Sequence, residues 1–104
     1  MNTITVTEYA DAVKILGEKA MKNVRDSKAL TCAAVLLSIF NPYEYPLNIG
    51  LLWKELVGMP LYDAAIVAIR GRCELCREPQ DLHKNGQEIM DEIIKVWSEK
   101  VRRK

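Results

Sequence analysis

The sequence has little of what marks secreted or membrane proteins. Its 104 residues include three cysteines, an odd number without framework spacing, which favours free thiols in a reducing compartment over a disulfide-stapled fold. Residues 1–9 lack the basic start and continuous apolar stretch of a secretory signal. No apolar run approaches the roughly 18 residues needed to cross a bilayer. These absences predict a cytoplasmic protein that does not associate with membranes.

An excess of charge and a catalytic signature are missing too. Fifteen basic residues against fourteen acidic ones leave a formal net charge of +1, too little for the whole molecule to attract nucleic acid. There is no glycine-rich phosphate loop, metalloprotease motif or paired-carboxylate motif. No recognisable motif ties a serine or cysteine to His83, the only histidine. We therefore expect a protein that is not an enzyme and needs no cofactor.

What is present is the ordinary composition of a folded domain, with 49% hydrophobic and 28% charged residues. The length fits a single domain, residues 1–104. Apolar residues recur at helical spacing in five segments. These are residues 7–24, 29–40, 48–57, 60–71 and 89–101. We predict an all-α fold, a compact single-domain bundle of about five helices around the central apolar helix at residues 29–40.

Signals for helix starts support these segments. Thr5 is followed three residues on by Glu8 in capping-box spacing, which predicts the start of the first helix. Ser27 and Asn48 are placed to cap the second and third helices. Pro60 is placed to open the fourth helix, because its missing N–H is not needed in a first turn.

Glycines give three further expectations. Gly17 lies inside the first helix and predicts a close approach by another helix. Gly58 follows the third segment and is expected to be left-handed, as is common after a helix. The fourth helix is expected to weaken at Gly71.

A loop with two tyrosines joins the second and third helices. The segment at residues 41–46, Asn-Pro-Tyr-Glu-Tyr-Pro, cannot continue a helix, because each proline lacks a backbone donor. Exposed amphipathic aromatic side chains are frequent anchors of protein interfaces. We predict a protein-binding surface at Tyr43, Glu44 and Tyr45 and expect Trp53 in the core. The alternative is that Trp53 and one tyrosine simply close over the core.

A second hypothesis is a small nucleic-acid-associated regulator, because basic residues gather at two places. Clustered cations contact phosphates readily. The residues concerned are Arg70, Arg72, Lys100, Arg102, Arg103 and Lys104. A plainer interpretation of the basic tail is that it complements the negative end of the last helix dipole.

A third hypothesis is a zinc-stabilised module, because three potential ligands lie within eleven residues. Cys73 and Cys76 form a Cys-x-x-Cys pair, and His83 follows. A closed zinc site needs a fourth ligand, for which Cys32 or Asp81 would have to serve. The alternative is that the cysteines are incidental residues at a helix end.

A pattern of apolar positions covers nearly two thirds of the chain, residues 33–97. It consists of Val35-Leu36-Leu37, Asn41, Leu47, Leu51-Leu52-Trp53, Asp63 and Ile93-Ile94-Lys95-Val96-Trp97. In this pattern the chain resembles a family of small uncharacterised proteins of bacteriophages, prophages and plasmids. The resemblance implies a helical domain from a mobile element, with no known activity and no functional residues to transfer.

Small proteins of such elements often bind and block a host protein, including components of antiviral defence. The resemblance therefore leads to our first hypothesis, a non-enzymatic protein-binding module that inhibits or modulates a host or antiviral-defence complex. Its partner would be a host protein or protein complex. Self-association into a homo-oligomer remains open.

Overall fold

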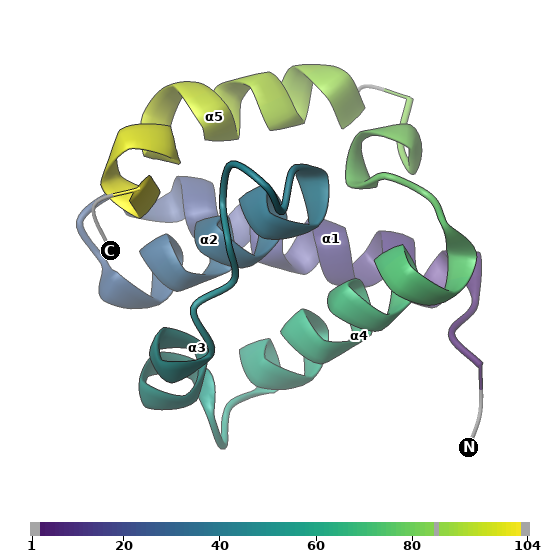
Figure 1. Cartoon of the computed structure of the whole chain (residues 1–104), viewed down its shortest axis with the longest axis horizontal. Coiled ribbons are helices and arrows are strands. Elements are labelled where there is room, and N and C mark those ends of the chain that lie inside the picture. Colours follow the sequence, from purple (N-terminus) through teal and green to yellow (C-terminus); the bar gives the residue numbers. More distant parts are fainter. Residues whose placement is uncertain (1–2, 85, 103–104) are drawn as a thin grey trace.

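The computed structural model describes residues 3–84 and 86–102 and confirms the all-α prediction (Figure 1). The elements are α1 (Val6–Lys22), α2 (Ser27–Phe40), α3 (Ile49–Leu56), α4 (Pro60–Leu75), the 3₁₀ turn η1 (Pro79–Asp81) and α5 (Gly86–Arg102). Within these two ranges there is no β-strand. No helix in the described part of the chain is long and apolar enough to span a membrane.

The central position of α2 is confirmed as well. It packs against α1, α3, α4 and α5, and Figure 1 shows α5 along one side of the bundle and α4 along the other. Because neighbours surround it, α2 buries residues around most of its circumference. The buried residues are Ala29, Thr31, Cys32, Ala33, Val35, Leu36, Leu37, Ser38 and Ile39.

Two of the predicted helix caps are present. The backbone N–H of Glu8 donates to Thr5 Oγ1 at 3.1 Å, and the N–H of Thr5 donates to the Glu8 carboxylate at 3.0 Å. These two bonds satisfy donors that a first helical turn leaves unpaired. Asn48 Oδ1 likewise accepts the N–H of Leu51 at 2.9 Å. The first and third helices thus begin where the sequence predicts.

The predicted cap of α2 is wrong by one residue. The carboxylate of Asp26 accepts the N–H of Lys28 at 2.9 Å, while Ser27 already belongs to the helix. Aspartate and serine cap equally well. Asp26 also interacts with α1, because its carboxylate forms an ion pair with the Lys19 ammonium at 2.7 Å. The local sequence does not distinguish Asp26 from Ser27 as the cap of α2. The residue that caps the helix is the one that also forms an ion pair with α1.

The close approach between helices lies at Gly71, not at Gly17. A methyl group on Gly17 would reach only Leu36 Cδ1, at an ordinary contact distance of 4.0 Å. A methyl group on Gly71 would collide with the ring of Tyr9, which is fully buried between α1 and α4. The predicted weakening of α4 at Gly71 is also wrong, since the helix continues to Leu75. Glycine leaves room there for the Tyr9 ring.

Candidate protein-binding surface

The outer side of α3 carries an exposed apolar row. Ile49 and Trp53 on α3, and Val57, the residue that follows its last turn, recur every four residues and are 71%, 64% and 41% exposed. This spacing places Ile49 and Trp53 side by side on one helix face, with Val57 just beyond its end. We call these three residues the α3 stripe. The neighbouring side of α3 is anchored in the core by Leu52 and Leu56. The expectation that Trp53 belongs to the core is therefore wrong.

The reason lies in the length and place of α3. The helix has eight residues and lies at the edge of the bundle, against α2 and α4 (Figure 1). Two rows of apolar residues four apart, Ile49 with Trp53 and Leu52 with Leu56, compete for that one supported side. These two rows were the signal in the sequence for a surface that sequence reasoning missed.

The two tyrosines of the loop before α3 differ in solvent exposure. Tyr43 is 96% exposed, whereas Tyr45 is 4% exposed and belongs to the hydrophobic core. The loop is shaped by Asn41, whose carbonyl accepts the N–H of Tyr45 at 2.9 Å. Of the predicted pair, only Tyr43 is available to a partner, and Tyr45 fulfils the alternative of one tyrosine closing over the core.

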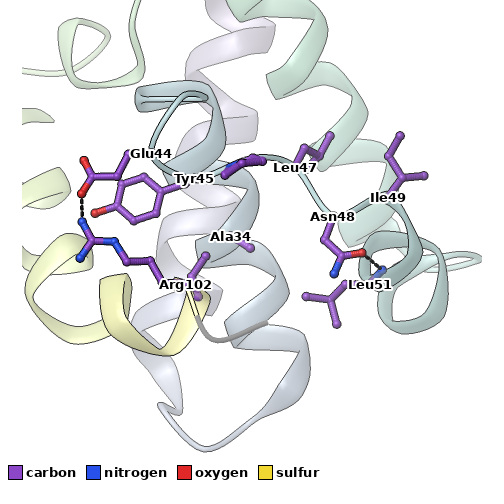
Figure 2. Close-up of a pocket in the computed structure, with 10 residues that line it drawn as sticks. Ala34, Glu44, Tyr45, Leu47, Asn48, Ile49, Leu51 and Arg102 are labelled. Carbon is purple, nitrogen blue, oxygen red and sulfur yellow. Dashed lines mark hydrogen bonds and ion pairs between the residues drawn. The ribbon is translucent and has the colours of Figure 1, made fainter.

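Glu44 connects the loop to the end of α5. Its carboxylate forms an ion pair with the guanidinium of Arg102, which also lies 5.3 Å from the centre of the Tyr45 ring (Figure 2). The ion pair is half-exposed, so its own contribution to stability is small. It nevertheless defines one wall of a groove beside the loop.

This first groove has a volume of about 580 Å³ and is walled by α2, the loop, the start of α3 and the end of α5 (Figure 2). Its apolar wall is formed by Ala34, Tyr45, Pro46, Leu47, Ile49, Leu51 and Val101. Ile49 belongs both to this wall and to the α3 stripe. The stripe and the groove therefore form one continuous apolar surface.

A second groove, of about 680 Å³, is also lined by Leu51 and lies between α3, the start of α2 and α5. Arg25, Lys54 and Lys100 line it together with two carboxylates, Asp26 and Glu55. Asp26 is neutralised by its ion pair with Lys19. Positive charge therefore predominates in this second groove, which none of the three stripe residues lines.

The four described residues of the nucleic-acid hypothesis have partners within the chain. Arg70 pairs with Glu74 at 2.7 Å, and Arg72 Nε donates to the carbonyl of Ile39 at 3.0 Å. Lys100 Nζ lies 5.2 Å from the centre of the Trp97 ring. Arg102 is paired with Glu44, and Arg103 and Lys104 lie outside the described residues.

The residues of the zinc hypothesis do not gather into a site. Cys73 and Cys76 are exposed at the end of α4, and His83 Nε2 lies 3.2 Å from the carbonyl of Ala10 on α1. Over residues 3–84 and 86–102, no group of three or more histidine, cysteine, aspartate or glutamate side chains is placed to hold a metal. Cys32 is buried in α2, and burial raises the pKa of its thiol to about 12.

Comparisons of the chain with models of protein families, with curated protein sequences and with solved structures give no match. The resemblance to proteins of mobile elements therefore stays a prediction.

Proposed function

We propose that the protein is a non-enzymatic binding module that inserts the α3 stripe into an apolar cleft of a partner protein. The observation that supports this proposal is the exposure of Ile49, Trp53 and Val57 in one row. Scattered exposed apolar residues are normal, but contiguous ones mark interaction sites. Tryptophan is among the residues most enriched at the energetic centres of interfaces.

The spacing of the stripe suggests how the partner is bound. Apolar anchors four residues apart are typical of a helix that lies in a groove of its partner. Eight helical residues extend about 12 Å, so the partner needs only a short cleft. Lys54, which is exposed and follows Trp53 on α3, favours a partner with an acidic group at the rim of that cleft. Tyr43 adds a further exposed aromatic contact.

The resemblance to proteins of bacteriophages, prophages and plasmids supplies the class of partner. We propose a host protein or protein complex, one that belongs to antiviral defence or to another process that a mobile element must redirect. Inhibition follows directly when the bound cleft is one that the host protein needs for its own partner.

The proposal is tested by capture from host lysate treated with nuclease, followed by affinity measurement with the purified partner. Trp53→Ala should weaken binding by about 2 kcal/mol, roughly 30-fold, as expected for a central anchor. Ile49→Ala should weaken it less. Ile15→Ala is the matched control, because Ile15 is an exposed apolar residue on α1, and it should leave the affinity unchanged.

The tyrosine loop needs separate variants. Tyr43→Ala should reduce affinity without affecting the fold, because this side chain is almost fully exposed. Tyr45→Ala does not test binding, because Tyr45 lies in the core and removal of its side chain lowers the stability of the fold. Circular dichroism on each variant separates the two effects.

Two results would contradict the proposal. If the captured complex is retained at equal affinity by the Ile49→Ala, Trp53→Ala double variant, α3 is not the binding surface. If sedimentation instead shows a dimer of this chain that dissociates in the double variant, the stripe serves self-association.

A further inference from the structure

The last turn of α4 ends in an unusual way. Cys76 adopts the left-handed conformation, with φ 54° and ψ 32°, and is the one non-glycine residue of the described ranges with a positive φ. This conformation costs a residue with a Cβ atom roughly 1–2 kcal/mol. Glycine or asparagine usually occupies such a position. A strained residue of another type points to a use for its side chain.

The strained turn places two thiols beside one space. Cys73 and Cys76 are both exposed, and Cys76 Sγ lies 3.9 Å from the carbonyl oxygen of Cys73, so it turns back toward that residue. Both cysteines line a groove of about 360 Å³. Its other walls come from the end of α2, the loop after α2 and α4, through Ser38, Ile39, Pro42, Leu47, Ile69 and Arg72.

We propose that Cys73 and Cys76 form a dithiol site for a soft, two-coordinate metal ion of the Cu(I) class. Zinc requires four ligands for a closed site, and the described residues provide no third ligand beside these two. Thiolates are the ligands that select Cu(I). A two-coordinate Cu(I) ion needs only two sulfur ligands, and Cys73 and Cys76 supply two. This inference does not depend on the proposed protein-binding function.

The binding step is a simple exchange of protons for metal. Each thiol loses its proton to solvent, each sulfur forms one bond to Cu(I), and the oxidation state of copper does not change. The product carries one negative charge, from two thiolates and one Cu⁺. Arg72 lies in the same groove, held by its hydrogen bond to the carbonyl of Ile39 at 3.0 Å; its guanidinium also lies 4.0 Å from the Glu78 carboxylate, so it compensates the negative charge of the site only in part.

The test is an anaerobic titration of the reduced full chain with Cu(I) in competition with bicinchoninate, read by native mass spectrometry. We expect one copper per chain, with the loss of two protons, and X-ray absorption should show two sulfur ligands. Cys73→Ser and Cys76→Ser should each lower the affinity by more than about 100-fold, because each removes one of only two ligands, whereas loss of an outer-shell partner alone costs about 10–100-fold. Cys32→Ala should leave the copper affinity unchanged, because Cys32 is buried and does not line the groove.

Two further variants distinguish loss of copper binding from loss of folding, and the effect of cysteine spacing from the number of thiols. Cys76→Gly relieves the left-handed strain, so this variant should stay folded and yet lose copper. The double variant Cys76→Ser, Arg77→Cys keeps two exposed cysteines at a different spacing and should bind more weakly than the wild type.

Three outcomes would overturn the proposal. The first is a wild-type chain that holds no copper against the competitor. The second is equal affinity in the variant with shifted spacing, which would mean that any two thiols suffice. The third is a reduced chain that ignores Cu(I) but forms a Cys73–Cys76 disulfide with a low-molecular-weight disulfide, which would assign the pair to redox chemistry.

Discussion

The two tryptophans of this protein lie on helices of different length and apolar content and have opposite environments. Trp97 on α5 is 1% exposed, and its indole N–H donates to the carbonyl of Ala20 at 2.9 Å. Trp53 on α3 is 64% exposed. The difference comes from the neighbours: α5 lies over α1, α2 and η1, whereas α3 rests on α2 and α4 at the edge.

The comparison teaches how burial and function divide in a small bundle. α5 has seventeen residues and a polar face, and the core uses most of its apolar side through Met90, Ile93 and Trp97, while Ile89 at its start is 37% exposed. α3 has eight residues and two apolar rows, of which the core uses one. A chain of 104 residues buries a limited share of its apolar surface. The row left over is the part of this molecule best suited to bind a partner.

The largest predicted effect separates these two tryptophans directly. Trp97→Ala should lower the free energy of unfolding by about 3–5 kcal/mol, because it empties a core site and removes a buried hydrogen bond. Trp53→Ala should change it by no more than about 0.5 kcal/mol. Urea denaturation followed by circular dichroism measures both. A comparable loss in Trp53→Ala would show that Trp53 is a core residue after all.

An effect of intermediate size compares two glycines. Gly71→Ala should destabilise the chain by about 1–3 kcal/mol, because the new methyl group meets the buried ring of Tyr9. Gly17→Ala should stabilise it by up to about 1 kcal/mol, because the methyl group fits and alanine favours the helix. The same denaturation experiment measures both. If the two variants change stability in the same direction, the packing of α1 on α4 is not as described.

Most of the fold was predictable because most of its signals are local. The capping box of Thr5 and Glu8, the cap at Asn48 and the left-handed Gly58 act within a few residues and are present as predicted. The errors arose where distant residues decide. The choice of Asp26 over Ser27 accompanies an ion pair with another helix, which no local pattern contains.

The site was predictable only in part, for a related reason. The sequence showed that residues 41–46 form a loop with two aromatic side chains, but not that the turn would bury Tyr45 and expose Tyr43. It showed an apolar α3, but not that only one side of that helix would be covered. Which side of an element faces the core is a property of the assembled bundle. Sequence patterns locate such a surface more reliably than they orient it.

The smallest predicted effect concerns Asp26, which joins the end of α1 to the start of α2. Its ion pair and hydrogen bond with Lys19, then its bond to the N–H of Lys28, lower the pKa of its carboxyl group. A carboxyl whose folded pKa lies below the unfolded value of about 3.9 stabilises the fold above that pH. This contribution is lost as the pH falls through the folded pKa.

Asp26→Asn tests this contribution, because asparagine still caps the helix but cannot pair with Lys19. The variant should be less stable than the wild type at pH 7, and the difference should shrink as the pH falls below about 4. Lys19→Gln should weaken the same pH dependence, and in the Asp26→Asn background it should add little. Denaturation at several pH values measures all three, at low salt because the pair is partly exposed. A difference between wild type and Asp26→Asn that stays constant from pH 7 to pH 2 would show that the pairing of Asp26 with Lys19 does not stabilise the junction.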